Sequence, residues 1–434
     1  MTLIEVACAK ILTRVEQKQI SIRGALEDYL KVDPSIRPVR DVVLALCLGT
    51  VRNYVLLDYL VKHVTGLETW RLPLFERYLV RVLTYEIKYR DCDLQRAERA
   101  LKYCKRANID LRTLLRIRDV NPNDIVSNLD TESRLHVLYS VPRWLVRYML
   151  SVFGIEETEN MLRAFNQRAP LYIRVNISRV SRGELLRRLR SRGVDAYPDD
   201  DLDDIILVEK LNVGLESLPE YRSGLFYIQD KASALVGHVV KLLTRRYSRV
   251  LDACSAPGGK AMHLQELVKC YVVAADVSYR RILTERDLVK RYLYTDIDLI
   301  CSNMIKPPLK RVNVDVIVLD PDCTSLGKLA HSPEVRLWIR RHHINEYARH
   351  QFKLASSLVR NINFTHLVYS TCTITLEENE HLIKKLCDEF GLELVDLSER
   401  FSKFSSRFLP GTLRAFPHVH RTCGYFVAAL RRVN

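Results

Sequence analysis

The sequence predicts a multidomain protein with an all-α N-terminal module, a small α+β module and a Rossmann-like α/β domain. Three observations support this fold class. The 434 residues amount to about three average domains. Apolar residues keep a three-to-four spacing in the N-terminal part of the chain, as in helices. From about Tyr227 onward, short apolar runs alternate with helical stretches, as in an open and mostly parallel sheet.

The first domain is expected to span 1–128 and to contain helices only. From Leu3 to about Ile125 alternation of the strand type is scarce, and the spacing of Leu57, Leu60, Val61 and Val64 is typical of a largely buried helix. Turn signals at Asn121–Pro122 mark the end of this module.

The second domain is expected to span 129–223 and to combine helices with a small sheet. Leu171–Asn176 alternates like a strand. Ser181 and Glu184 then have the spacing of a capping box, which predicts a helix that closes at Gly193. Ile205–Val208 is expected to form a further strand after an acidic turn.

The third domain is expected to span 224–434 and to hold the α/β sheet. Six apolar runs have the length and composition of strands in such a sheet. They are Val250–Leu251, Tyr271–Ala275, Leu299–Ile300, Val314–Leu319, Leu367–Val368 and Tyr425–Ala428.

Composition limits the class of protein and its partners. A formal charge of +15 favours a polyanionic partner, although an Arg-rich surface alone would also account for it. Eleven cysteines without a CxxC pair argue against a disulfide framework and against a paired zinc site, so we expect no metal. Without an apolar run of about 20 residues or a signal-peptide pattern, we expect a cytoplasmic protein. A monomer is the default expectation.

Polar groups follow four successive strands at the sheet edge where ligands bind. A Gly-rich turn, Leu251–Lys260, lies between a strand and a helix, and Asp276 ends the next strand, placed to accept hydrogen bonds from a ribose diol. Asn303 and Asp320 end the following two strands. The GxGxxG and GxxxxGK[ST] phosphate loops are absent, which favours a methyltransferase over a dehydrogenase or a P-loop enzyme.

Two cysteines at this edge indicate the reaction class. Cys323 and Cys372 each follow a strand of the predicted sheet. Carbon 5 of cytosine is a poor nucleophile, so its methylation requires prior addition of a thiolate to carbon 6, and a base must later remove the carbon-5 proton. The alternative is that both cysteines are small buried apolar residues, which is the usual fate of a free cysteine.

Seven strings in a fixed order make the chain resemble the Sun family of RNA cytosine-5 methyltransferases, especially its RsmB-type members with a NusB-like N-terminal domain. The strings are Arg174-Val175-Asn176, Gly224 with Phe226–Asp230, Leu251–Lys260, Ala275–Ser278 with Arg281, Leu319–Gly327, Tyr369–Cys372, and Arg414–His418 with Gly424–Phe426. Leu48–Arg52, with Leu56, Leu57 and Tyr59, matches the NusB-like module more weakly.

The resemblance implies a role for each matching residue. Cys372 would be the nucleophile, Cys323 would assist proton removal or product release, and Asp320 would position the cytosine, with Lys260 helping to order it. The third domain would be a methyltransferase domain that binds S-adenosylmethionine through Cys254, Ser255, Ala256, Pro257, Gly258, Gly259, Lys260, Asp276, Arg281, Asn303 and Asp320.

Three positions depart from the family pattern, and one of them, Cys423, stands where an acidic or small polar residue is common and leads to no expectation. Asp322 precedes Cys323 where the family usually has Pro, and a neighbouring carboxylate should raise the pKa of that thiol. Asn303 stands where the family commonly has Asp, which affects the expected adenine contact.

The substrate is expected to be RNA with an unpaired or extruded cytosine, because a stacked base hides both faces of its ring. Arg174, Asn176, Arg187 and Arg188 are the predicted RNA contacts, and a second basic cluster, Arg336 with Arg340–His342, follows the first cysteine. The RsmB-type resemblance favours ribosomal RNA, and transfer RNA is the alternative.

Two other functions remain open on the sequence. The first is a non-catalytic RNA-binding assembly factor on a methyltransferase scaffold, which the paired cysteines and Asp320 disfavour. The second is a DNA cytosine methyltransferase, whose nucleophile follows a Pro in the region of Cys323, where this chain has Asp322.

Overall fold

The computed structural model describes residues 3–211, 214–308 and 312–433. The chain packs into two compact units, Met1–Arg168 with Leu329–Arg341, and Ala169–Lys328 with His342–Asn434. Among the described helices, none alone is long and apolar enough to cross a membrane. The bent pair Pro34–Arg52 and Tyr54–Thr65 passes the same length and composition test only when taken together.

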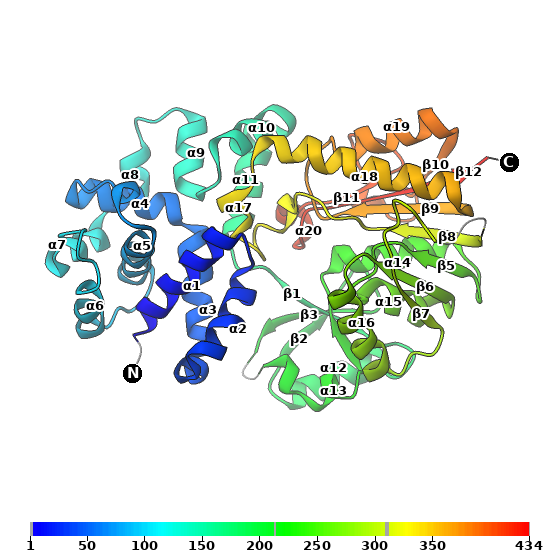
Figure 1. Ribbon diagram of the computed structural model, residues 1–434, viewed down its shortest axis with the longest axis horizontal. Helices are drawn as coiled ribbons and strands as arrows, with labels where there is room; N and C mark the ends of the chain where they lie inside the picture. Colours follow the sequence, from blue (N-terminus) through cyan, green and yellow to red (C-terminus); the bar gives the residue numbers. More distant parts are fainter. Residues whose placement is uncertain (1–2, 212–213, 309–311, 434) are drawn as a thin grey trace. The chain divides into compact units, whose positions relative to one another are not determined.

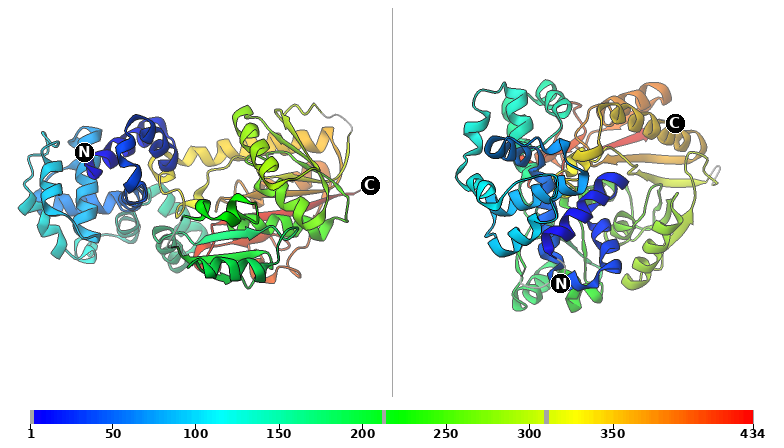
Figure 2. Two further views of the ribbon diagram at one scale, coloured as in Figure 1. Left: turned by 90° about the horizontal axis from the view of Figure 1, so that it is seen from below. Right: turned by 60° about the vertical axis from the view of Figure 1, so that its left-hand side comes forward.

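The first unit is built from helices, and no strand occurs among its described residues (Figures 1 and 2). Apolar residues from the first nine α-helices bury one continuous core. The α-helices are α1 (Ile4–Lys18), α2 (Ile22–Val32), α3 (Arg40–Arg52), α4 (Tyr54–Thr65), α5 (Leu74–Tyr89), α6 (Leu94–Leu101), α7 (Leu111–Leu115), α8 (Pro122–Val126), α9 (Thr131–Tyr139), α10 (Arg143–Phe153) and α11 (Ile155–Asn166). Short 3-10 helices are Pro34–Val39, Thr69–Arg71 and Arg116–Asp119.

The segment Leu329–Arg341 belongs to the first unit although it follows Cys323 closely in the sequence. Its helix α17 (Val335–Trp338) carries Arg336, which is only 1% exposed. The Arg336 guanidinium donates to the carbonyl oxygens of Arg52 and Tyr139, each at 3.0 Å. We expected Arg336 to follow an RNA backbone, and its burial corrects that expectation.

The second unit begins with a four-stranded antiparallel sheet in the order β2-β3-β1-β4. Helix α12 begins after Ser181, whose side chain accepts a hydrogen bond from the Glu184 amide, as the capping-box spacing predicted. The elements are β1 (Leu171–Val175), α12 (Arg182–Ser191), β2 (Asp195–Pro198), β3 (Ile205–Lys210), the 3-10 turn Leu215–Ser217, α13 (Pro219–Arg222) and β4 (Phe226–Ile228).

An eight-stranded sheet forms the rest of the second unit, in the order β10-β12-β9-β8-β5-β6-β7, with β11 paired to β12. The strands β9, β8, β5, β6 and β7 are parallel, whereas β10, β11 and β12 pair antiparallel at one side. The strands are β5 (Arg249–Asp252), β6 (Tyr271–Asp276), β7 (Ile297–Cys301), β8 (Asn313–Leu319), β9 (Asn363–Thr371), β10 (Leu392–Val395), β11 (Leu413–Ala415) and β12 (Tyr425–Arg432).

Helices cover both faces of this sheet (Figure 1). Alternate strand residues pack against α14, α15 and α16 on one face and against α18 and α19 on the other. The helices are α14 (Lys231–Leu243), α15 (Gly259–Val268), α16 (Tyr279–Tyr292), α18 (Arg341–Asn361), α19 (Glu380–Phe390) and α20 (Pro417–His420), with 3-10 turns at Leu326–Lys328 and Ser402–Phe404. This arrangement confirms the predicted fold class.

The predicted strands are all present, and β2, β4, β10 and β11 were missed because they are only three or four residues long. The division at 128 and 223 remains a prediction. The two compact units divide the chain differently, since residues 129–168 pack with the N-terminal helices.

Candidate active site

The loop between β5 and α15 brings seven of the predicted cofactor residues, Cys254–Lys260, to the carboxyl edge of the parallel strands. Gly258 has a φ of 101°, and a Cβ there would lie 2.7 Å from Cγ of Glu285. Glycine is therefore required by both the conformation and the space. The Ser255 amide donates to the Ala275 carbonyl at 2.9 Å, and its hydroxyl donates to Glu285 at 2.8 Å. These bonds tie the loop to β6 and α16.

Two buried carboxyl groups lie beneath this loop with incomplete partners. Among the described residues, neither oxygen of the fully buried Asp252 has a hydrogen-bond partner, and Oε1 of Glu285 has none either. Burial, together with Glu285, raises the pKa of Asp252 to about 8. Burial also raises the pKa of Glu285 to about 7. Such groups fit a cationic ligand, because a positive charge would compensate the negative charge of the ionised carboxylates. S-adenosylmethionine carries two such charges, on an ammonium and a sulfonium group.

Asp276 ends β6, Arg281 lies in the first turn of α16, and Asn303 follows β7. Asp276 is buried at the end of β6, accepts from the Ser278 amide at 2.8 Å and pairs with Arg281 at 3.4 Å. Arg281 also donates to the Ala256 carbonyl, so it links the second strand end to the glycine loop. Asn303 is exposed beyond β7, and its side-chain oxygen accepts from the Ile305 amide at 3.0 Å.

Asp320, just past β8, is the centre of a polar cluster. Nζ of Lys260 lies 2.5 Å from one carboxylate oxygen. The hydroxyl groups of Ser370 and Tyr425 donate to the other, at 2.9 and 3.1 Å. Burial alone would raise the pKa of Asp320, but the charge and hydrogen bond of Lys260 outweigh it and hold the pKa below its ordinary value. Asp320 is therefore an oriented, ionised acceptor.

The two predicted cysteines face each other with 3.3 Å between their sulfur atoms. The hydrogen bond from Cys323 lowers the pKa of the half-buried Cys372 thiol; burial opposes this, and the charge of Lys328 assists it. The same hydrogen bond, with burial, raises the pKa of Cys323. We expected Asp322 to raise it, but the leading carboxylate cause is Glu378, and Asp322 is exposed. Cys372 is thus the thiolate of the pair.

The loops that carry the two thiols are fixed to each other at several points. The Gly327 amide donates to the Cys372 carbonyl at 3.0 Å, and the Gly424 amide donates to the Gly327 carbonyl at 2.8 Å. A Cβ on Gly327 would lie 1.9 Å from the Gly424 carbonyl oxygen, so this approach needs glycine. Buried Glu378 accepts from the backbone amide of Thr324 at 2.9 Å and from its hydroxyl at 2.6 Å.

The four predicted RNA contacts divide into two buried and two exposed residues. Arg174 is fully buried, forms a bidentate ion pair with Glu266 of α15 and donates to the Gly259 carbonyl at 2.6 Å. Asn176 is 1% exposed and donates to the Gly224 carbonyl at 3.1 Å. Arg174 therefore has no surface to offer to RNA; it positions the glycine loop. Arg187 and Arg188 are exposed on α12.

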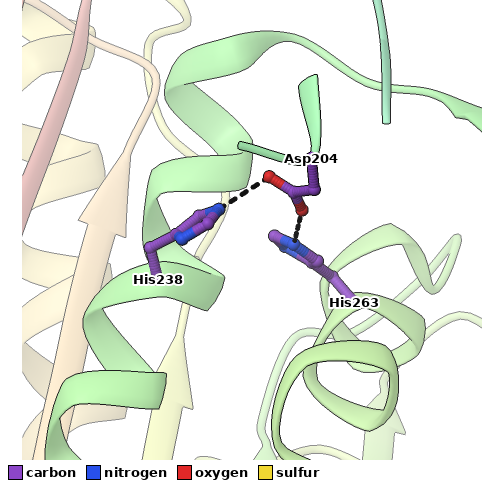
Figure 3. A group of neighbouring side chains, drawn as sticks. All are labelled: Asp204, His238 and His263. Atoms are coloured by element: carbon purple, nitrogen blue, oxygen red, sulfur yellow. Dashed lines mark hydrogen bonds and ion pairs between the residues drawn. The ribbon is translucent and has the colours of Figure 1, made fainter. Parts of the chain in front are cut away.

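A second link joins the small sheet to the helices α14 and α15 (Figure 3). The buried Asp204 carboxylate bonds to Nε2 of His238 on α14 at 2.7 Å and to Nε2 of His263 on α15 at 2.6 Å. These three side chains also have metal-ligand spacing. A metal-bound imidazole usually donates its second N–H to an acceptor, whereas Nδ1 of His263 has no partner within the described chain. Burial lowers the pKa of His263 to about 3, whereas the two imidazoles hold the pKa of Asp204 below its ordinary value against the effect of burial. The cluster is therefore a hydrogen-bonded link between an ionised carboxylate and a neutral His263.

Comparison with known proteins agrees with this geometry. A family model described as 16S rRNA methyltransferase RsmB/F matches residues 239–431. A second model, the RsmF/B-like ferredoxin-like domain, matches residues 141–213, and together they cover more than half of the chain. The chain belongs to the RsmB/F methyltransferase family. This membership confirms the predicted family, the enzyme class and the S-adenosylmethionine cofactor.

Relatives of the family extend over most of the chain. The probable ribosomal RNA small subunit methyltransferase B of Bacillus subtilis is 24% identical, with 97% of each chain covered. The human 28S rRNA (cytosine(4447)-C(5))-methyltransferase is 27% identical over 69% of this chain, which spans only 39% of that longer protein. The crystal structure of PH0851 is 26% identical, has a TM-score of 0.80 and covers 100% of this chain and 99% of that chain.

Several functional residues were missed by sequence reasoning. Asp252 lies within the predicted turn Leu251–Lys260, but it was given no role there. Lys328, Glu378 and Tyr425 each act through tertiary contacts with the cysteines or Asp320, and no local pattern marks them. Tyr425 lay in a matched family string without an assigned role.

Proposed function

We propose that this protein methylates carbon 5 of a cytosine in ribosomal RNA through a transient bond between Cys372 and carbon 6 of the base. The observation that carries the proposal is the pair of sulfur atoms, 3.3 Å apart, in which their mutual hydrogen bond lowers the pKa of Cys372 and raises that of Cys323. A non-catalytic scaffold would have no need for such an activated thiol.

Asp320 is placed to select and orient the base. An ionised carboxylate accepts a hydrogen bond from the exocyclic amine of cytosine, whereas uracil presents a carbonyl oxygen that it would repel. The ammonium of Lys260 and the hydroxyl groups of Ser370 and Tyr425 fix this carboxylate before the base arrives. The target base would therefore be held by its exocyclic amine on Asp320.

Asp252, Glu285, Asp276, Arg281 and the glycine loop would hold S-adenosylmethionine. When bound, this sulfonium compound supplies the methyl group. Gly258 allows the backbone of the loop to approach Glu285 closely, and the carboxyl groups of Glu285 and Asp252 are both fully buried.

Cys323 is suited to act after the covalent bond has formed. The largest cause of its raised pKa is the hydrogen bond to Cys372. Once the Cys372 sulfur is bonded to carbon, its negative charge is gone, and the pKa of Cys323 falls. Cys323 can then release its own proton to water and, as a thiolate, accept the carbon-5 proton. The electrons of the carbon–hydrogen bond re-form the double bond between carbons 5 and 6, the bond from carbon 6 to sulfur breaks, and Cys372 leaves as a thiolate.

The natural substrate and setting follow from the family and the charge. We propose ribosomal RNA in the cytoplasm, bound by a monomer with no metal ion, and Arg187 and Arg188 as phosphate contacts. Tritium transfer to ribosomal and transfer RNA, followed by bisulfite sequencing, tests this. Methylated cytosines in ribosomal RNA that vanish with Cys372→Ala are expected, and unchanged transfer by this variant would contradict the proposal.

A further inference from the structure

Outside the methylation cycle, Cys323 and Cys372 form a contact pair that a mild oxidant could close. Their sulfur atoms are 3.3 Å apart. A disulfide bond is about 2.05 Å long, so closure needs an approach of little more than about 1 Å. The hydroxyl of Ser325 lies 3.6 Å from the Cys372 sulfur and 3.9 Å from the Cys323 sulfur, so it lines the same contact.

The two loops hold the sulfur atoms face to face. One is anchored by Glu378 through Thr324, and the hydroxyl of Thr324 lies 2.6 Å from that of Thr373, the residue after Cys372. The backbone bond from Gly327 to Cys372 adds a second link. A small motion of the side chains therefore suffices, without rearrangement of the sheet.

The two thiols differ in the way that reversible oxidation requires. Cys372 is half-buried and has thiolate character, while Cys323 is 9% exposed and remains a thiol. Peroxides react with thiolates that they can reach, and a neighbouring thiol then resolves the product before it is oxidised further. Two other arrangements of cysteines occur in the described chain. Cys8 and Cys47 interact with each other, but both are fully buried. Cys423 is buried and close enough to be affected by the charge of Cys372, but its thiol donates to Asp230 at 3.0 Å.

We infer that hydrogen peroxide converts Cys323 and Cys372 into a reversible disulfide that protects the nucleophile from irreversible oxidation and closes the site. In the first step, the Cys372 sulfur attacks one peroxide oxygen, an S–O bond forms, the O–O bond breaks and hydroxide leaves. In the second, the Cys323 sulfur attacks the Cys372 sulfur, the S–S bond forms and the S–O bond breaks. The departing oxygen takes the Cys323 proton and leaves as water, and the two thiols together have lost two electrons.

The disulfide itself concerns two sulfur atoms in the free protein, and only its effect on methyl transfer rests on the proposed function. The purified full-length protein is titrated with hydrogen peroxide, free thiols are blocked by alkylation, and tryptic peptides are mapped by mass spectrometry. The expected product is a Cys323–Cys372 linked peptide that dithiothreitol removes. Methyl transfer to RNA, measured in parallel, should fall with the linked fraction and return after reduction.

Two variants make the result decisive. With Cys323→Ser, no link can form, and Cys372 should accumulate as sulfinic acid at least tenfold more than in the parent protein. Cys387→Ser, on α19 and remote from the described contacts of the pair, should behave like the parent protein. Circular dichroism checks that both variants are folded. Cys372 sulfinic acid in the parent protein without the link, or a link to another cysteine, would overturn the inference.

Discussion

The two halves of the candidate site are organised differently. In the cofactor half, Asp252 and Glu285 are buried with oxygen atoms that lack partners in the described structure, and their pKa values are raised to about 8 and about 7. In the half that holds the base and the thiols, Asp320, Cys323 and Cys372 each have close partners already. The unpartnered carboxyl groups of the cofactor half are therefore electrostatically unfavourable until a cation binds. The groups of the half with the thiols are already held in position for the reaction. The following predictions test this contrast.

Arg174→Ala should produce the largest effect, because it removes the support of the cofactor half. The buried Glu266 would lose its bidentate partner, and breaking a buried pair in this way costs about 3–5 kcal/mol. Urea unfolding should show a corresponding fall in the free energy of unfolding. Arg188→Ala, at an exposed position of the same small module, should change it by about 0.5 kcal/mol or less. Equal effects of the two variants would show that Arg174 is not a buried support.

Gly327→Ala should damage the thiol half selectively. The new Cβ would lie 1.9 Å from the Gly424 carbonyl oxygen, so the two cysteine loops must separate. A displacement of about 1 Å in a catalytic group can cost about a hundredfold in rate. We expect that loss in single-turnover methyl transfer, with the affinity for S-adenosylmethionine unchanged. Gly183→Ala is the matched control, since a Cβ there meets nothing within 4 Å. A normal rate for Gly327→Ala would refute the requirement for close loops.

Asp252→Asn should weaken binding of S-adenosylmethionine by about tenfold to a hundredfold, the equivalent of about 1.5–3 kcal/mol for a hydrogen bond to a charged group. Because the pKa of Asp252 is raised from 3.8 to about 8, the parent protein must release a proton to bind a cation below pH 8. Its affinity, measured by calorimetry, should therefore rise from pH 6 to pH 8. The variant should lose this slope, whereas Asp287→Asn, at an exposed position on α16, should keep it.

The same raised pKa has a consequence for stability without ligand. The folded state holds a proton on Asp252 that the unfolded chain releases near pH 4, so its contribution is fully present below pH 4 and is lost as the pH rises toward 8. The difference in unfolding free energy between the parent protein and Asp252→Asn should shift in this pH window. A difference that is constant between pH 4 and 8 would mean that Asp252 is not buried as a neutral acid.

Arg187→Ala and Arg188→Ala should have the smallest effect. Each would remove about one phosphate contact, reducing the slope of RNA affinity against salt concentration by roughly 0.7–1. Fluorescence anisotropy at several salt concentrations measures this slope. Arg431→Ala, another exposed arginine of the same unit, is the control. If all three variants gave the parent slope, α12 would not contact the RNA backbone.

The sequence was sufficient to predict the strands of the α/β sheet and the polar residues that follow them, because turn chemistry and strand periodicity are local properties. It was not sufficient to predict which charged side chains are buried and which partners they contact. Arg174 belongs to a basic segment and was taken as an RNA contact, yet its partner Glu266 lies 92 residues further along the chain. The cause of the Cys323 pKa shift was misassigned to Asp322 for the same reason, since Glu378 approaches only in the folded protein.

The central claim is that the sulfur of Cys372 bonds to the pyrimidine ring. The protein is incubated with S-adenosylmethionine and RNA containing 5-fluorocytosine, in which fluorine replaces the proton that must leave after methyl transfer and so stalls the reaction. The account predicts a stable protein–RNA adduct that peptide mapping places on Cys372 and that Cys372→Ala lacks. An adduct on Cys323, or no adduct while ordinary RNA is methylated, would contradict it.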